Sequence, residues 1–204
     1  DQREVGIDTH SYEEALKNAL REAPDVIMIG EIRDRNTMKQ AIAYAETGHL
    51  CLSTLHANNA NQAMERVINF FPEEAHRQLL VDLSLNLAGV VSQRLIPGLH
   101  EKLVPAVEVM LNSSYISDLI TKGEFSGIKE AMARSTEIGM CTFDQALYQL
   151  YTEDRISLDE ALHNADSRTD LALRIRLAAG VSSQDAGDLS IDTSSPIQSA
   201  ARLA

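Results

Sequence analysis

The sequence contains no tryptophan, few other aromatic residues and only two cysteines among 204 residues. Cys51 and Cys141 lie far apart and form no paired motif, which argues against a zinc knuckle and indicates a reducing compartment. No apolar run approaches the roughly 20 residues that cross a bilayer, and no signal peptide is visible. Basic residues are few as well, and the formal net charge of -12 argues against a broad electrostatic contact with nucleic acid or anionic lipid.

Apolar residues are plentiful, at 44%, which is enough for a real core in one domain or one and a half. Residues 26–29 form a short unbroken apolar run, typical of a strand buried on both faces of a parallel sheet. Pro24 ends the helical pattern that precedes this run. Glu31, Arg33 and Asp34 follow it at once. Because ligands of open α/β sheets bind at the carboxyl ends of strands, these charges are candidates for contact with an ion or phosphate.

An alternation of helices and strands surrounds this run. A capping box begins a helix over 11–23, apolar residues at helical spacing predict a helix around 38–45 that ends at Gly48, and residues 50–54 form the next strand. Strand, helix and strand in succession predict a βαβ crossover and therefore a parallel sheet. The other expected elements are helices over 61–71 and from Pro72-Glu73 with an apolar face reaching Val90, strands over 90–96 and 104–111 joined by a hairpin-like loop, and short helices over 115–121, 125–134, 143–152, 158–164 and 171–177.

The stretch 20–34 resembles the Walker B region of the secretion ATPases that drive type II secretion and type IV pili. It contains Leu-Arg, Pro-Asp, three aliphatic residues and then Gly-Glu-Ile-Arg-Asp, so each element of that signature is matched. The resemblance implies that Glu31 is the Walker B acid and acts on Mg²⁺ through water. It implies that Arg33 and Asp34 support the loop by ion pairing, which contributes little energy where the pair is exposed.

The same resemblance implies the architecture. It predicts an α/β fold that is the second half of a RecA-like P-loop NTPase core, with a mixed and largely parallel sheet closed by a Ser-Gln-Arg-Leu strand. The expected division is an ATPase core portion over 1–111, a helical subdomain over 112–177 and a disordered tail over 178–204.

Two histidines bracket the strand predicted over 50–54. Their spacing, without a cysteine or third histidine nearby, argues against zinc, and the residues alone are compatible with two capping or surface imidazoles. Thr-Gly-His, five residues and Leu-His are similar to the family's His box. That likeness implies that His56 senses the γ-phosphate and that His49 orients the strand end or contacts a neighbouring group. Arg66, off the apolar stripe of its helix, is either a solvated arginine or, by resemblance, a group near phosphate or a subunit edge.

The helix expected from Ser114 to Lys122 indicates the subfamily. Pilus retraction ATPases of the PilT type carry Ala-Ile-Arg-Asn-Leu-Ile-Arg-Glu there, whereas this chain has Ser-Tyr-Ile-Ser-Asp-Leu-Ile-Thr-Lys. That departure, with residues 55–62 and 139–144, is similar to the companion PilU type. The resemblance implies a motor subunit that binds and hydrolyses ATP with Mg²⁺ for pilus retraction (twitching motility). It further implies a homohexamer in the cytoplasm at the bacterial inner membrane, in contact with a related retraction ATPase and a membrane platform protein.

Two alternatives remain. The chain is compatible with a non-hydrolysing interaction subunit that assembles with an active retraction ATPase. The type II secretion assembly ATPase would carry a four-cysteine zinc module, against which two distant cysteines argue.

Two parts of an NTP-hydrolysing site are not in the sequence. None of the ten glycines starts a Gly-x-x-x-x-Gly-Lys-Ser/Thr loop, and the acidic box that supplies a water-activating glutamate is also missing. In the family both precede the point where this sequence starts, and the first residue is Asp rather than Met. We therefore expect a cut N-terminus and no ATP turnover by this chain alone.

Overall fold

The computed structural model describes residues 4, 6–11, 14, 15, 18, 21, 22, 24–178 and 180. Most of the helix predicted over 11–23 and almost all of the predicted tail over 178–204 lie outside these residues. No helix in the described part of the chain is long and apolar enough to cross a bilayer.

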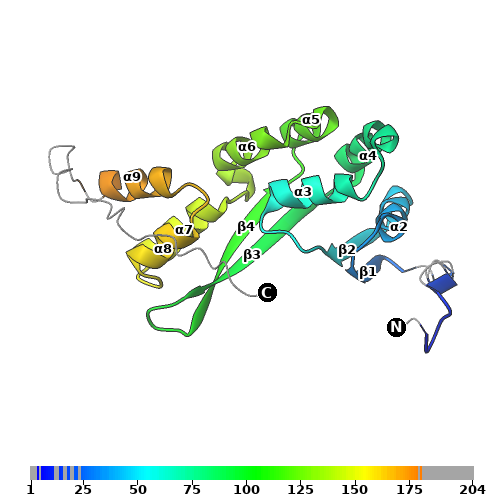
Figure 1. The fold of residues 1–204 in the computed structure, drawn as a ribbon, viewed down its shortest axis with the longest axis horizontal. Helices are drawn as coiled ribbons and strands as arrows, with labels where there is room; N and C mark the ends of the chain where they lie inside the picture. Colours follow the sequence, from blue (N-terminus) through cyan, green and yellow to red (C-terminus); the bar gives the residue numbers. More distant parts are fainter. Residues whose placement is uncertain are drawn as a thin grey trace, which may run out of the picture.

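The chain folds as an α/β protein, as predicted. Figure 1 shows the helices gathered along one side of the strands, with α7, α8 and α9 at the end away from α2. The described elements are β1 (Val26–Glu31), α2 (Arg35–Glu46), β2 (Leu50–Thr54), α3 (Ala60–Asn69), α4 (Glu73–Asn86), β3 (Gly89–Pro97), β4 (Leu103–Leu111), α5 (Ser114–Lys122), η1 (Phe125–Gly127), α6 (Ile128–Arg134), η2 (Thr136–Ile138), α7 (Phe143–Thr152), α8 (Leu158–Asn164) and α9 (Arg168–Ala178).

The strands form two pairs. β1 and β2 are parallel and connected through α2, which confirms the predicted βαβ crossover. β3 and β4 form the predicted hairpin and pair antiparallel along their whole length. The two pairs belong to separate sheets among the described residues, so the expected closure of the core sheet by β3 is not seen there. The partner of β3 is the neighbouring strand β4, which one short loop brings back beside it.

Only one face of β1 is buried, which corrects the prediction of burial on both faces. Ile27 and Ile29 are buried, whereas Val26 and Met28 on the opposite face are exposed, Met28 to 74%. Leu50 and Leu52 pair with those two residues and are exposed as well. An apolar run indicates that both faces of a strand are suited to burial. In the described part of the chain, helices cover only one of the two faces.

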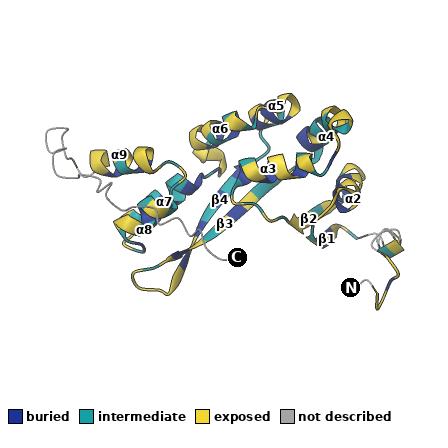
Figure 2. Cartoon of the chain, viewed as in Figure 1, coloured by how far each residue is buried: buried dark blue, intermediate teal, exposed yellow. Residues whose placement is uncertain are grey.

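Two hydrophobic clusters form the core. The first joins β1 and helices α2–α6, with Ile29, Met64 and Ile120 among its buried members. The second joins the hairpin to α7–α9, with Ile96 and Phe143 at its centre. Figure 2 shows exposed residues on the outer sides of the helices. The domain boundary at residue 112 stays a prediction.

The helix ends follow the sequence signals with one exception. Gly48 has a φ of 91°, the left-handed conformation expected after the last turn of α2. A capping box, a common sequence signal for a helix start, begins α7, with Thr142 and Gln145 as its two members. The prediction that the apolar face of α4 continues to Val90 is wrong. α4 ends at Asn86 because Leu87 is extended, and Val90 belongs to β3.

Candidate functional site

Glu31 and His56 meet at one edge of the parallel sheet. Because β1 and β2 run in the same direction, their carboxyl ends lie at the same edge and bring together two residues that are distant in sequence. Nε2 of His56 lies 2.9 Å from Oε1 of Glu31, a distance at which an imidazole N–H donates to a carboxylate. The Glu31 side chain is 19% exposed and the His56 side chain 81% exposed. The glutamate is therefore held by its surroundings, whereas the imidazole is open to solvent.

A β-bulge separates the strand from its acidic end. Ile29 pairs with Ser53 and Glu31 pairs with Thr54, so Gly30 is an extra residue on β1. The Thr54 hydroxyl donates to the Gly30 carbonyl at 2.6 Å, and pairing resumes where the Ile32 N–H donates to the Thr54 carbonyl. Such bulges re-aim a side chain at a strand end. Here the bulge sets the position from which Glu31 reaches His56.

Arg33 and Asp34 have different surroundings. Nε of Arg33 donates to Oε2 of Glu31, and the arginine side chain is largely exposed. Among the described residues Asp34 forms no ion pair, contrary to the prediction. It caps α2, because its Oδ1 accepts from the backbone N–H of Thr37 at 2.9 Å and from the Thr37 hydroxyl at 3.1 Å. The Thr37 N–H is also the main reason that the pKa of Asp34 is lowered.

His49 lies at the opposite end of β2 from His56. Its Nδ1 is 2.9 Å from the hydroxyl oxygen of Thr47, and its ring stands edge-on to Tyr44 with centroids 6.3 Å apart. The structure therefore does not bring His49 to Glu31. Arg66 lies in the last turn of α3 and is exposed, where a cation interacts favourably with the helix dipole. Nucleotide-supporting roles for His49 and Arg66 stay predictions.

The chemistry of the site fits Mg²⁺ held through water. Mg²⁺ prefers oxygen ligands and usually keeps several waters, binding through one or two carboxylates and substrate phosphates. Glu31 supplies one carboxylate at the strand ends, and no group of three or more His, Cys, Asp or Glu in the described part of the chain could form a protein cage. A single carboxylate suits contact through a hydration shell.

Two residues that the sequence left without a role contact the segment that carries His56. From the hairpin, Arg94 on β3 donates to the carbonyl of Asn58, and Glu108 on β4 accepts from the N–H of Ala60, the residue that follows this segment. Glu108 carried a visible signal, because it occupies a core position in an alternating strand, in line with Ala106 and Met110. Arg94 lay in the predicted Ser-Gln-Arg-Leu strand, but no local pattern indicates which distant groups it reaches.

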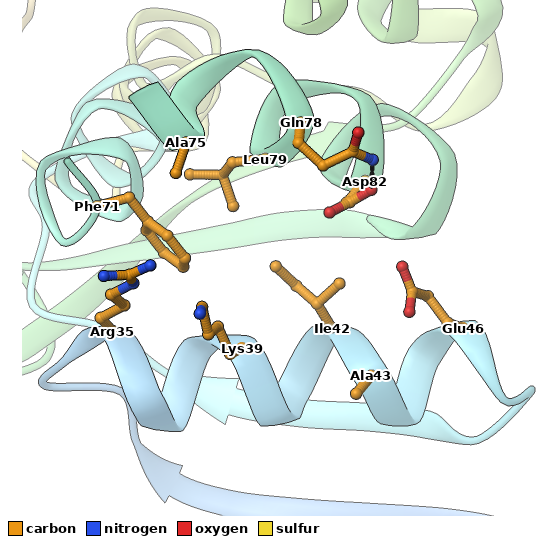
Figure 3. A pocket seen from close by; sticks show the side chains of 10 residues that line it. All are labelled: Arg35, Lys39, Ile42, Ala43, Glu46, Phe71, Ala75, Gln78, Leu79 and Asp82. Atoms are coloured by element: carbon orange, nitrogen blue, oxygen red, sulfur yellow. Dashed lines mark hydrogen bonds between the residues drawn. The ribbon is translucent and has the colours of Figure 1, made fainter. Parts of the chain in front are cut away.

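A groove between α2 and α4 lies apart from these residues. It has a volume of about 400 Å³ and contains none of the predicted site residues. Figure 3 shows Arg35 and Lys39 toward one end and Glu46 and Asp82 toward the other. The guanidinium of Arg35 lies 5.7 Å from the centre of the Phe71 ring. The apolar floor of the groove is already packed, since Ile42, Phe71 and Leu79 are each buried.

The chain is similar to several known proteins. The family model described as "Type II/IV secretion system protein" matches residues 5–170. The chain is 60% identical over 190 residues to the type IV pilus ATPase PilU of Pseudomonas aeruginosa, covering 93% of this chain and 49% of that protein. It is 38% identical over 165 residues to the pilus retraction ATPase PilT of the same species, covering 81% and 48%.

A solved structure of the pilus retraction motor PilT with bound ADP is also similar. It matches with a TM-score of 0.75 and 37% identity, covering 85% of this chain and 49% of that one. The chain thus spans about half the length of the relatives it matches. The family model covers most of the chain, and two pilus ATPases align with nearly the same span. The chain therefore belongs to the family of type II/IV secretion system proteins.

Proposed function

We propose that this chain is the part of an ATP-hydrolysing motor subunit for type IV pilus retraction that carries Glu31 and His56. The observation that supports the proposal best is the contact between these two side chains at the carboxyl ends of adjacent parallel strands. In the proposal the subunit forms a homohexamer in the cytoplasm at the inner membrane, with ATP and Mg²⁺ as cofactors. Its partners there are a related retraction ATPase and a membrane platform protein.

Each residue has a role that its surroundings suit. Mg²⁺, when bound, neutralises charge on the phosphates that are transferred. Glu31 orients water of the ion's hydration shell, because its carboxylate is held in place at the bulge. His56 is largely exposed and senses the γ-phosphate. Arg33 holds the second oxygen of Glu31, and Asp34 fixes the start of α2 behind the site.

ATP turnover by the full-length protein tests the proposal. Glu31→Gln keeps the size of the side chain and removes its charge, so kcat should fall by about 100-fold or more, the factor expected from losing a few kcal/mol of charge stabilisation. Assembly, measured by light scattering after gel filtration, should be unchanged. Glu65→Gln, on the exposed side of α3, is the matched control and should keep kcat. Normal turnover by Glu31→Gln would refute the proposed site, and the 204-residue chain alone should give none.

A second candidate is an interaction subunit that assembles with an active ATPase without hydrolysing ATP itself. It is favoured by α5, whose exposed face carries Tyr115 and the Asp118–Lys122 ion pair in place of the arginine-rich phrase of the PilT type. Pilus retraction in cells that carry Glu31→Gln beside a working partner ATPase separates the two candidates. Retraction should persist for an interaction subunit and should fail for a motor that hydrolyses ATP.

A further inference from the structure

The segment that carries His56, residues 55–59, joins the end of β2 to the start of α3. His56 is exposed, so the position of its imidazole depends on how firmly the backbone on either side is held. On the strand side, β2 is paired with β1 up to Thr54. On the helix side, Asn59 caps α3 through the N–H of Gln62. Two further contacts on this side come from the hairpin, far away in sequence.

Glu108 supplies the first hairpin contact. Its Oε1 accepts from the backbone N–H of Ala60 at 2.7 Å. Ala60 is the first residue of α3, where a backbone N–H has no partner within the helix and a negative charge is favoured by the helix dipole. Glu108 is 2% exposed and sits opposite Ser92 in the hairpin. A buried carboxylate on a paired strand has little freedom, so it fixes the start of the helix.

Arg94 supplies the second contact and also binds residues at the C-terminal helices. One guanidinium nitrogen, Nη2, donates to the carbonyl of Asn58 at 3.3 Å and to Oδ1 of Asp166 at 2.7 Å. The other, Nη1, donates to the carbonyl of Asn164 at 2.8 Å. The guanidinium also stacks on Phe143, 3.9 Å from its ring centre. The guanidinium holds these three acceptors in a fixed planar geometry while its face stacks on Phe143, a combination that the compact ammonium of a lysine does not reproduce.

The far side of this connection is itself well held. Asp166 also pairs with Lys129 at 3.3 Å, and its backbone N–H donates to Asp144 at 2.7 Å. Lys129 pairs with Asp144 as well. Arg94 therefore connects this network of ion pairs and hydrogen bonds at the C-terminal helices to the backbone carbonyl of Asn58, two residues after His56.

We propose that Arg94 is a positioning residue for His56, which holds residues 55–59 from the hairpin together with Glu108 and ties that segment to helices α7–α9. The inference rests on the proposed role of His56 at the nucleotide. Arg94 touches no reacting group and acts through the backbone of Asn58. Through Arg94, a movement of α7–α9 would displace the imidazole of His56, and a displacement of the imidazole would be transmitted to these helices.

Hydrogen–deuterium exchange of the full-length protein tests the contact directly. In Arg94→Ala, the amides of residues 55–62 should exchange about tenfold faster, because a hydrogen bond that limits local opening is lost. Arg155→Ala is the matched control, since Arg155 also joins the hairpin to the helical region, through Glu101, but does not contact residues 55–59. Its exchange at 55–62 should equal that of the wild type. Unchanged exchange at 55–62 in Arg94→Ala overturns the inference.

Glu108 offers a conservative pair of variants. Glu108→Gln keeps an oxygen that accepts from the Ala60 N–H and should leave exchange at 55–62 as in the wild type. Glu108→Ala removes the acceptor and should raise it. If Arg94→Ala does not fold, Arg94→Lys keeps a positive charge for Asp166 while losing the planar guanidinium, and it should still raise exchange at 55–62. Wild-type exchange at 55–62 together with wild-type turnover in Arg94→Lys would contradict the proposed role of the planar guanidinium.

Steady-state ATP hydrolysis separates positioning from general stability. Arg94→Ala should lower kcat by about tenfold, with KM changed less than about twofold, because a misplaced group costs rate more than binding. In a His56→Ala background the same substitution should cause no further loss. The inference is overturned if the two substitutions lower kcat additively in the double variant. It is also overturned if Arg94→Ala keeps the wild-type kcat while His56→Ala alone is impaired. If His56→Ala alone turns over normally, the proposed function fails, and exchange at 55–62 still decides whether Arg94 holds the segment.

Discussion

Replacing Glu108 by glutamine should stabilise the fold at neutral pH, although it alters a buried, hydrogen-bonded side chain. Burial raises the pKa of the Glu108 carboxyl, and the nearby Asp166 raises it further. The N–H groups of Ala60 and Phe143 and the charge of Arg94 lower it, but by less. Burial raises the pKa of the nearby Cys141 thiol, and the charge of Glu108 raises it further. The folded protein therefore disfavours the charged form, and glutamine keeps an acceptor for the Ala60 N–H without that charge.

The sign of the pH dependence follows from the raised pKa. Between the unfolded value of about 4.5 and the higher folded value, the folded protein binds more protons than the unfolded chain. Stability from Glu108 is thus complete below about pH 4.5 and is lost as the pH rises through the folded pKa. Each unit between the two pKa values corresponds to about 1.4 kcal/mol at high pH. The advantage of Glu108→Gln should grow over this window and then level off.

Urea unfolding followed by circular dichroism, at several values between pH 4 and 8, measures this advantage. Glu65→Gln on the exposed side of α3 is the control, and it should change the unfolding free energy by less than about 0.5 kcal/mol at pH 7. Glu108→Ala should be less stable than Glu108→Gln by about 1–3 kcal/mol, because the Ala60 N–H loses its acceptor. A wild-type protein that gains stability over Glu108→Gln as the pH rises would show that the carboxylate is favoured when charged, and the reasoning would fail.

Two further substitutions test the supports of the site. Asp34→Ala should lower the unfolding free energy by about 1 kcal/mol at pH 7 through loss of the α2 cap, whereas Asp34→Asn should cost a few tenths, as urea unfolding would record. Because the pKa of Asp34 is lowered, its contribution is present above the unfolded value of 3.8 and is lost as the pH falls through the folded pKa. Phe143→Ala should cost about 3–5 kcal/mol by opening the second core cluster, and Phe143→Leu much less; equal effects of the two would contradict the packing described.

Local patterns in the sequence predicted most of the elements. The strand over 50–54 and the helices over 143–152 and 158–164 have the expected bounds, because capping residues and apolar spacing mark them within a few positions. The sequence put Glu31 and His56 after two strands of a parallel sheet, whose ends share one edge, but it did not predict that the two side chains are in contact.

What the sequence did not reveal depends on contacts between distant residues. Glu108 and Ala60 are 48 positions apart, and Arg94 and Asp166 are 72 apart, so no short pattern pairs them. The bulge at Gly30 depends on how two strands align, and the exposed face of β1 depends on which elements cover it. The resemblance implies an ion pair for Asp34, whereas the structure shows that the N–H groups at the start of α2 are its nearer partner.

The bulge at Gly30 has a consequence for how natural variation at the strand end should be interpreted. A methyl group on its α-carbon would meet no heavy atom within 4 Å, and its backbone is not in the left-handed region. The described fold therefore tolerates alanine at this position as readily as glycine. If related proteins nevertheless keep glycine there, the reason would be a group outside this fold that contacts the backbone at Gly30, such as a phosphate or a neighbouring subunit. Pilus ATPases with a larger residue at this position would then be expected to lack that contact.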